Sequence, residues 1–382
     1  MSVDVVQLTG AEFDEAMAFL NEVFGEHQPH DFATLLPSIY QPTDEHMSCN
    51  YAVRVDGQLR AVVGLFPMAW QVGDTVLKVG GIGGVSTHSS VRGAGYMKVL
   101  MNHCVQVMIE EQYDLSWLGG QRQRYGYFGY EKCGARTRLT LSATNLRHAQ
   151  QETPITFVPI DAGDDAALMV AQGLHDQQAV FCRRAPEAFH RYLSVGYRRP
   201  YLATDTRGAV IGYLVVDDKG GEVVEMVARN QHQLAEIAGA WVRARDDSAS
   251  FLAMPTSTDL LQQLSPLVEG ESVTSSGNWQ IFDWEKTVGA LLRARALSTS
   301  LPDGRVSFGI EEVGTLEIEV TAGQVECRRS TAAAAVIWSA FTAMRVLFGP
   351  LPAEAVVHIP PALAALHSWC PLPLGWSQQD YV

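Results

Sequence analysis

Apolar side chains recur three and four positions apart over residues 11–24, a spacing that predicts an amphipathic helix. A second short helix is predicted around residues 33–40. The pattern then changes, because residues 51–72 and 75–87 are runs of β-branched and aromatic residues typical of strands. Two hairpin turn signals separate these strands, Asp56-Gly57 and Gly73-Asp74. Helical spacing returns over residues 96–112, and a short apolar strand is predicted at 114–119. This order predicts a mixed α+β layer rather than repeated β-α-β units.

The same order of elements occurs a second time after about residue 150. Two helices, two strands, a helix and a final strand are predicted there, at 164–178, 186–196, 200–218, 221–229, 230–245 and 248–255. The two halves share element order but no obvious residue identity. The sequence therefore predicts two similar folds in tandem.

The end of the chain has a different pattern. Three short strands are predicted at 305–312, 315–320 and 323–329, and the alanine-rich run 330–344 is predicted to be a helix. The proline-rich tail carries Trp369, Trp376 and Tyr381, and aromatic side chains near a terminus usually dock against a core. The predicted organisation is an α+β protein of three domains, with bounds at 1–148, 149–285 and 286–382.

Composition narrows the classes of partner. Hydrophobic residues fill 47% of the 382 positions, enough for a large core, and the formal net charge is −14. An acidic protein is a poor match for nucleic acid or anionic membranes, and it favours cationic substrates. No apolar run reaches the ~18 residues of a membrane span, and the N-terminus lacks the features of a secretion signal. With six scattered cysteines and no C-x-x-C pair, we expect a cytoplasmic protein with reduced thiols.

One segment carries recognisable chemistry. Residues 83–98 run from the end of a predicted strand through a glycine-rich turn into a helix. Glycines let a backbone approach an anion closely, and the first turn of a helix has unpaired N–H groups, so this segment can hold a phosphate. It lacks the Gly-Lys-Ser/Thr of a Walker loop and the dinucleotide-binding fingerprint. The alternative is a β–α turn that merely contains glycine.

This segment resembles the pyrophosphate loop of the GNAT superfamily of N-acetyltransferases, Arg/Gln-x-x-Gly-x-Gly/Ala. The loop is matched by Arg92-Gly93-Ala94-Gly95-Tyr96-Met97, with Met97 in place of the last small residue. A second element of the superfamily, Tyr-x-x-x-Gly-Phe/Tyr, is matched further along by Tyr125-Gly126-Tyr127-Phe128-Gly129-Tyr130. The two motifs lie in the expected order, with a predicted helix and strand between them.

Two GNAT-like domains followed by a small sterol-carrier-like domain resemble the enhanced intracellular survival (Eis) family. In that family the first domain binds acetyl-CoA, the second has lost the pyrophosphate loop, and the third sends the C-terminus into the active site of the first. Here the strand at 221–229 is followed by Asn230-Gln231-His232-Gln233, without glycine, which agrees with the second of these features. The resemblance also implies a homo-oligomer, as large as a hexamer.

The resemblance implies roles for individual residues. Tyr125 would be the general acid beside the sulfur, and the carboxylate of Val382 would be the general base. Backbone groups of Val85, Ser86 and Thr87 would pair with the pantetheine arm and polarise the acetyl carbonyl. The remaining contacts to CoA would come from Arg92, Gly93, Ala94, Gly95, Tyr96, Met97, Lys98, Gly120 and Gln121.

The acceptor is expected to be a small cationic amine, such as an aminoglycoside, a polyamine or a lysine side chain, attacking acetyl-CoA directly through a tetrahedral intermediate. Phe24 and Glu26, in the loop between the first two predicted helices, are the candidate acceptor contacts. His27 and His30 in this loop suggest a metal site, but Pro29 prevents helical presentation, and we expect no metal. Two other hypotheses stay open: a CoA-binding regulatory protein with weak turnover, and a lipid carrier built on the last domain.

Overall fold

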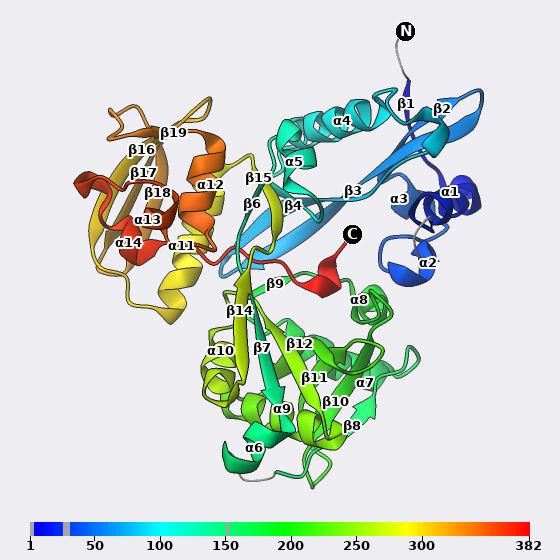
Figure 1. The fold of residues 1–382 in the computed structure, drawn as a ribbon, viewed down its shortest axis with the longest axis vertical. Helices are drawn as coiled ribbons and strands as arrows, with labels where there is room; N and C mark the ends of the chain where they lie inside the picture. Colours follow the sequence, from blue (N-terminus) through cyan, green and yellow to red (C-terminus); the bar gives the residue numbers. More distant parts are fainter. Residues whose placement is uncertain (1–3, 26–30, 150–152) are drawn as a thin grey trace.

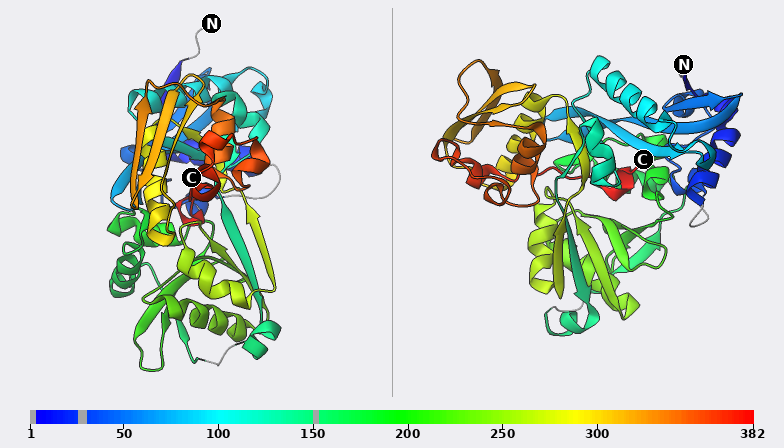
Figure 2. Two further views of the ribbon diagram at one scale, coloured as in Figure 1. Left: turned by 90° about the vertical axis from the view of Figure 1, so that its left-hand side faces the viewer. Right: turned by 45° about the horizontal axis from the view of Figure 1, so that its top comes forward.

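The computed structural model describes residues 4–25, 31–149 and 153–382 (Figure 1). These residues form three regions, each built on its own β-sheet, with eight, seven and four strands. The C-terminal segment runs between the first two regions, and its end lies near the centre of the ribbon in each view (Figures 1 and 2).

The first sheet has the strand order β1-β2-β3-β4-β5-β15-β6, and β9 pairs with the far end of β3. Helix α4 (Tyr96–Glu110) covers one face, and α1 (Phe13–Gly25) and α2 (Phe32–Leu35) cover the other. The two predicted hairpin turns are confirmed. The strands and the remaining short helices are β1 (Val5–Gln7), α3 (Asp44–Met47), β2 (Asn50–Val55), β3 (Gln58–Val72), β4 (Thr75–Thr87), β5 (Leu115–Leu118), α5 (Arg122–Tyr125), β6 (Glu131–Cys133), β9 (Val180–Cys182) and β15 (Gly277–Ile281).

The second sheet has the order β14-β7-β13-β12-β11-β10-β8. Helix α9 (Gln231–Arg245) packs on one face, and α7 (Asp165–His175) and α8 (Phe189–Leu193) pack on the other. The strands and the other helices are β7 (Arg136–Ser142), α6 (Ala143–Ala149), β8 (Thr156–Pro159), β10 (Arg199–Thr204), β11 (Val210–Val216), β12 (Glu222–Ala228), β13 (Ser248–Ala253), α10 (Thr258–Leu264) and β14 (Gly270–Thr274).

The two large sheets share one strand order and exchange one strand. Read in matching directions, they run β1-β2-β3-β4-β5-β15-β6 and β8-β10-β11-β12-β13-β7-β14, which confirms the predicted tandem of similar folds. The exchanged strand is the sixth in each sheet. Strand β7 follows β6 of the first sheet in the chain but pairs in the second sheet, and β15 follows β14 of the second sheet but pairs in the first. The predicted divisions after residues 148 and 285 therefore do not follow sheet membership, because β7 precedes the first and β15 precedes the second.

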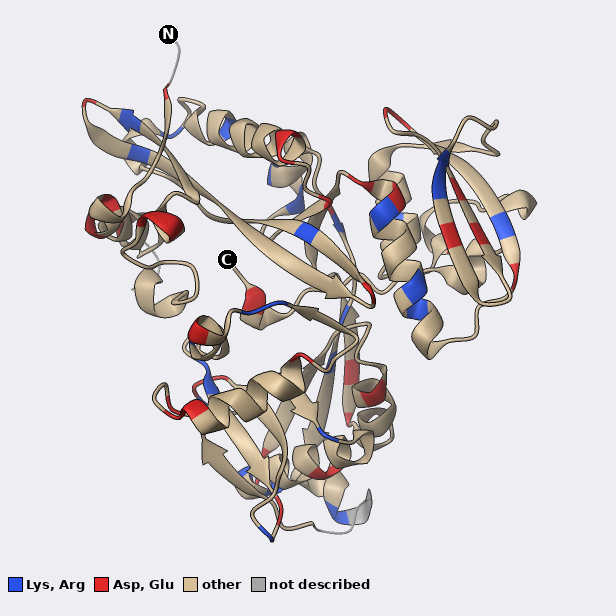
Figure 3. Cartoon of the chain, turned by 180° about the vertical axis from the view of Figure 1, so that it is seen from behind, with Lys and Arg blue, Asp and Glu red and all other residues tan. Residues whose placement is uncertain are grey.

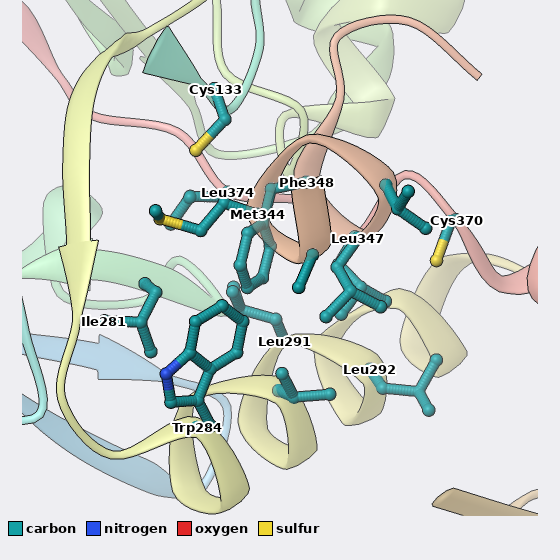
Figure 4. Packing of buried hydrophobic residues seen from close by; sticks show 14 of the residues in the cluster. Cys133, Ile281, Trp284, Leu291, Leu292, Met344, Leu347, Phe348, Cys370 and Leu374 are labelled. Carbon is teal, nitrogen blue, oxygen red and sulfur yellow. The ribbon is translucent and has the colours of Figure 1, made fainter. Parts of the chain in front are cut away.

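The third region is a four-stranded sheet, β18-β17-β16-β19, with helices α11 and α12 beside it. Side chains of these helices, among them Trp284, Leu291 and Phe348, meet Cys133 and Ile281 of the first sheet in one core (Figure 4). The third region is thereby packed onto the first. Its elements are α11 (Trp284–Ser298), β16 (Gly304–Ile310), β17 (Gly314–Thr321), β18 (Gln324–Ser330), β19 (Ile337–Trp338), α12 (Ala340–Phe348), α13 (Ala353–Val356) and α14 (Leu366–Trp369).

The prediction of a helix over residues 330–344 is wrong for its first half. Helix α12 begins only at Ala340, where the hydroxyl of Ser339 accepts a hydrogen bond from the N–H of Thr342 at 3.2 Å. The alanines of the run 332–335 lie in an irregular and largely exposed connection. Alanine favours helix only weakly, and a short helix without an apolar face to bury is not stable in water.

Candidate active site

The glycine-rich turn between β4 and α4 has the backbone geometry of an anion cradle. Gly93 and Gly95 adopt φ values of 90° and 85°, and an added Cβ at either would meet no neighbouring atom. Glycine is therefore required here by the backbone path rather than by packing. Gly95 is also the N-cap of α4, and no side chain caps this helix, so no side chain competes for its first-turn N–H groups.

Met97, which stands where the loop pattern has a small residue, does not obstruct the glycine turn. Met97 and Tyr96 pack against the core beneath α4, so the bulk of Met97 lies on the protein side of the turn. The predicted contacts from Arg92 to Lys98 thus lie in one turn, and the stretch from Arg92 to Gly95 is exposed.

The first sheet opens beside this cradle. Strands β4 and β5 pair in parallel from Val79 opposite Leu115 to Ile82 opposite Leu118, after which β5 ends and β4 continues. The continuing part of β4 contains a bulge, because its register with β3 shifts at Gly84, whose φ is 58°. Bulges re-aim backbone groups. The predicted segment Val85, Ser86 and Thr87 begins within the bulge and continues along the edge that β5 has left.

Tyr125 lies just past this opening, at the end of α5. Its ring packs on Gly120, where an added Cβ would come within 2.6 Å of a ring carbon. The residue is 6% exposed, and burial raises the pKa of its hydroxyl, although Arg124 partly opposes that shift. The phenol of Tyr125 therefore carries its proton at neutral pH.

The strand exchange brings a residue to this site that the sequence analysis missed. Gly120 and Gln121 form the exposed turn after β5, and the side-chain amide of Asn278 on β15 donates a hydrogen bond to the Gly120 carbonyl at 3.0 Å. Asn278 is buried. No local signal marks it, because its partner lies 158 positions away and β15 follows the second sheet in the chain.

The C-terminal residue, Val382, packs against β4 at two glycines of that strand. Gly81 and Gly83 point to the same face, because side chains alternate along a strand. An added Cβ at Gly83 would lie 2.4 Å from the carbonyl carbon of Val382, and one at Gly81 would lie 2.8 Å from its side chain. Larger residues at these positions would exclude the tail. The structure thus places the predicted general base against the strand that forms the cradle.

Aromatic contacts fix the tail before it reaches β4. The ring of Tyr381 lies 4.6 Å from that of Trp117, and the hydroxyl of Tyr381 accepts a hydrogen bond from Arg136 at 2.7 Å. Trp376 packs among Trp117 and two further indoles, those of Trp70 and Trp279. The predicted docking of the C-terminal aromatic residues is confirmed.

Tyr125 and Val382 belong to opposite faces of the first sheet. Tyr125 packs in the cluster under α4 with Ile82 and Leu100, whereas Val382 packs in the cluster under α1 and α2. A thioester that lay in the opening between β4 and β5 would therefore have one of these residues on each side.

A cavity of about 200 Å³ adjoins Val382 on the α1 side. It is lined by Ser38, Ile39, Glu45, His46, Cys49, Phe66, Pro67, Met68, Tyr192, Asp380, Tyr381 and Val382. Asp380 is engaged by Arg184, whereas no ion pair among the described residues involves Glu45. The cavity therefore combines apolar walls with two carboxylates, those of Glu45 and Val382.

Of the predicted acceptor contacts, Phe24 is not among the residues that line this cavity. Phe24 packs on Phe32, with ring centroids 4.9 Å apart, in the core between α1 and α2. Glu26 lies outside the described residues, as do His27 and His30. Glu45 was not predicted, because nothing around it in the sequence distinguishes it from an ordinary surface acid.

Tyr40 brings an unpaired hydroxyl to the bulge of β4. The residue is fully buried, and its Oη has no hydrogen-bond partner within the described part of the chain. An added Cβ at Gly84 would lie 2.6 Å from that oxygen. Burial raises the pKa of Tyr40, so its hydroxyl keeps its proton and is available as a donor beside Gly84 at the bulge.

Charged residues are spread over all three regions (Figure 3). No group of three or more His, Cys, Asp or Glu among the described residues is arranged to hold a metal ion. All six cysteines are free thiols, buried or half-buried. No helix in the described ranges is long and apolar enough to cross a bilayer.

Residues 4–133 match the profile of the acetyltransferase (GNAT) domain, and the match ends with β6, the last strand before the exchange. Residues 4–133 therefore form an acetyltransferase (GNAT) domain. A probable N-acyltransferase from Enterococcus faecalis V583 superposes on this chain with a TM-score of 0.71 at 15% identity, covering 100% of both chains. A GCN5-related N-acetyltransferase from Kribbella flavida gives 0.67 at 18% identity, covering 100% of this chain and 98% of the other.

Eis1 from Mycobacterium abscessus gives a TM-score of 0.65 at 14% identity, with both chains fully covered. This chain therefore shares the fold of Eis1 over its whole length. No curated protein matches it by sequence.

Proposed function

We propose that this protein transfers the acetyl group of acetyl-CoA to a primary amine of a small cationic acceptor. The observation that supports this most directly is the arrangement on β4. Strand β4 diverges from β5 and leads into the glycine turn, where no side chain caps helix α4. On the same strand, Gly81 and Gly83 leave room for Val382, which adjoins a cavity with two carboxylates.

The cofactor side of the proposal uses the cradle and the opening. Backbone N–H groups from Gly93 to Lys98 would bind the pyrophosphate, helped by the partial positive charge at the start of α4. The pantetheine arm would pair along Val85–Thr87 where β5 has departed, with Gly120 and Gln121 on its other side. Backbone N–H groups at the bulge would then polarise the thioester carbonyl.

The chemical step needs one proton removed and one supplied. The amine nitrogen attacks the thioester carbon, and the tetrahedral intermediate then collapses with cleavage of the C–S bond. The carboxylate of Val382 would take the proton that the amine loses, directly or through a water, and Tyr125 would protonate the departing sulfur. A carboxylate with an ordinary pKa near ~3.5 is a weak base for an ammonium near ~10, so holding the ammonium close is an equal part of its role.

The acceptor side follows from charge and shape. Glu45 and Val382 would attract an ammonium, and the apolar residues Ile39, Phe66 and Met68 would contact its carbon chain. A neutral amine of the same shape would gain less from the two carboxylates. We therefore propose a cationic acceptor, with Glu45 as a contact in addition to Phe24 and Glu26.

The test is CoA thiol release from acetyl-CoA by protein ending at Val382, with aminoglycosides, polyamines, lysine peptides and uncharged amine analogues as acceptors. Turnover with cationic amines, and a Glu45→Gln variant that raises KM for them while leaving kcat within a few-fold, is the expected result. Turnover without any preference for positive charge would contradict the proposed acceptor class. Absence of turnover with all amines, together with tight acetyl-CoA binding, would favour the regulatory alternative.

The resemblance to the Eis family adds two points to the proposal. The third region would be a sterol-carrier-like domain, and the protein would assemble as a homo-oligomer. Light scattering on the full chain tests the second point, because a monomer at micromolar concentration would contradict it.

A further inference from the structure

One arginine of the second region is entirely buried against the C-terminal tail. Arg184 follows β9 in the chain, and its side chain is 0% exposed. Its Nε and Nη2 donate to the two carboxylate oxygens of Asp380 at 2.8 and 3.1 Å. Its Nη1 and Nη2 donate to the two oxygens of Glu225 on β12 at 3.0 and 2.7 Å. Both carboxylates are thus bound in two-point geometry.

Two neighbours reinforce the Glu225 end of this cluster. Tyr213 donates to Glu225 at 2.7 Å, and Ser377 of the tail donates to it at 3.3 Å. Burial alone would raise the pKa of Glu225, but Arg184 lowers it to about 2. Glu225 is therefore ionised at neutral pH. Removing one partner of a buried ion pair is costly, because it leaves the other charge buried and unpaired.

The cluster fixes the tail close to its end. The carbonyl oxygen of Asp380 accepts a hydrogen bond from the Trp376 indole at 3.0 Å, so both the side chain and the backbone of Asp380 are held. Arg198 donates to the side chains of Gln378 and Gln379, and Gln379 donates to the Tyr192 carbonyl at 2.7 Å. Val382 lies two positions beyond Asp380, a span of about 7 Å at most. Val382 can therefore move little while Asp380 is held.

We propose that Arg184 is a positioning residue: from the second region it holds Asp380 and thereby sets the Val382 carboxylate against β4 of the first region. The second GNAT-like region then serves the reaction by holding the tail, without a cradle of its own. This inference rests on the proposed function only for its effect on turnover. The effect on the position of the tail can be measured separately.

Two variants and a matched control test the proposal. Asp380→Asn removes the side-chain charge that faces Arg184 and leaves the Arg184–Glu225 pair intact, so the second region should stay folded. Arg184→Gln removes the other partner. Arg138→Gln is the control, because Arg138 forms a 2.6 Å ion pair with Glu222 on the same strand as Glu225 but does not contact the tail.

The first readout does not depend on activity. Intact-mass measurement follows the release of Val382 by a carboxypeptidase at 25 °C, well below the unfolding temperature of each variant. Release should be at least about tenfold faster in Asp380→Asn and Arg184→Gln than in the original chain or in Arg138→Gln. Equal release rates in all four proteins would overturn the proposal.

The second readout separates positioning from general destabilisation. In the full chain, Asp380→Asn and Arg184→Gln should lower kcat about 10²-fold and leave the affinity for acetyl-CoA unchanged. In a chain lacking Val382, the same substitutions should cause no further loss, because they act through that residue. If the substitutions lower kcat of the truncated chain by a similar further factor, the proposal is overturned. If the original chain shows no turnover while carboxypeptidase release still depends on Arg184, the proposed function fails and the clamp stands.

Discussion

The two large sheets have the same strand order and the same opening, yet the turn after the fourth strand differs between them. After β4, helix α4 begins at Gly95 with no side-chain cap. After β12, helix α9 begins at Asn230 in a capping box with Gln233, whose side-chain oxygen accepts a hydrogen bond from the N–H of Asn230 at 3.1 Å. The first helix leaves its N–H groups for a ligand, and the second uses its own side chains.

The opening in each sheet also has a different occupant. β12 and β13 pair only at Glu222 and Val223, so β12 diverges from its neighbour as β4 does. The diverging part of β12 carries Glu225, which binds Arg184 and Ser377. In the second sheet the diverging strand is contacted by Ser377 of the tail, and in the first sheet Val382 at the end of the same tail lies against Gly81 and Gly83 of β4. A duplicated fold can lose its ligand and keep a structural role in the reaction.

The largest effect is expected from a substitution of Tyr125, the proposed general acid of the first region. Tyr125→Phe should lower kcat by about 10²–10⁴-fold with little change in acetyl-CoA affinity, because the proton donor is lost and the ring stays packed. Steady-state kinetics and isothermal titration measure the two quantities. Since burial raises the pKa of Tyr125, turnover of the original chain should not decline until the pH exceeds about 10. Full activity in the phenylalanine variant would remove Tyr125 from the mechanism.

Gly83→Val tests whether β4 must leave room for the tail. Valine suits a strand, so the sheet should fold, but its side chain would collide with Val382. We expect kcat to fall about 10²-fold while acetyl-CoA binding stays within a few-fold. Gly173→Ala on α7 is the control, because an added Cβ there meets nothing within 4 Å. Equal kcat in both variants would show that the tail position does not matter.

A pair of substitutions tests the difference between the two turns directly. Gly95→Ala strains a residue at φ 85° and should weaken acetyl-CoA binding about tenfold, a loss of about 1.4 kcal/mol. Asn230→Ala breaks the capping box and should lower the free energy of unfolding by about 1 kcal/mol without changing acetyl-CoA affinity. Calorimetric titration and thermal unfolding of both variants measure this. A change in acetyl-CoA affinity in Asn230→Ala would break the proposed division of labour.

Tyr40→Phe should separate stability from turnover at the bulge. The Tyr40 hydroxyl has no hydrogen-bond partner among the described residues, so its removal should leave the unfolding temperature unchanged or slightly raised. If the hydroxyl donates to a bound substrate, kcat/KM should fall about tenfold. A loss of stability would instead indicate a structural hydrogen bond.

The smallest effect concerns acid stability. The pKa of the Glu225 carboxyl is about 2 in the fold, below its ordinary value of 4.5, so its contribution is complete above pH 4.5 and is lost as the pH falls toward 2. The unfolding temperature should drop by several degrees over this range, and Glu225→Gln should flatten the dependence while lowering stability at pH 7. An identical pH slope in both proteins would show that Glu225 is not the group responsible.

Local signals in the sequence predict what depends on neighbouring residues. Glycine at positions 93 and 95, the hairpin turns and the helix beginning at Tyr96 follow from backbone preferences, and the structure agrees. The exchange of β7 and β15 could not be predicted, because an alternating strand carries no mark of its partner sheet. Arg184 and Asn278 were missed for the same reason, since their partners are distant in the chain, whereas Glu45 was missed because nothing around it in the sequence distinguishes it from a surface acid. The helix predicted over the alanine run at 332–335 does not form, because helix propensity alone does not stabilise a short helix that has no apolar face to bury.

The most direct test of the account compares two proteins that differ only at the end of the tail. One ends at Val382, and the other carries two additional glycines, which move the terminal carboxylate away from β4. Acetyl transfer to a cationic amine and acetyl-CoA affinity are measured for both. The account predicts equal affinity and at least about 10²-fold lower kcat in the extended protein. Equal turnover in the two proteins would contradict the claim that the second region holds a catalytic carboxylate for the first.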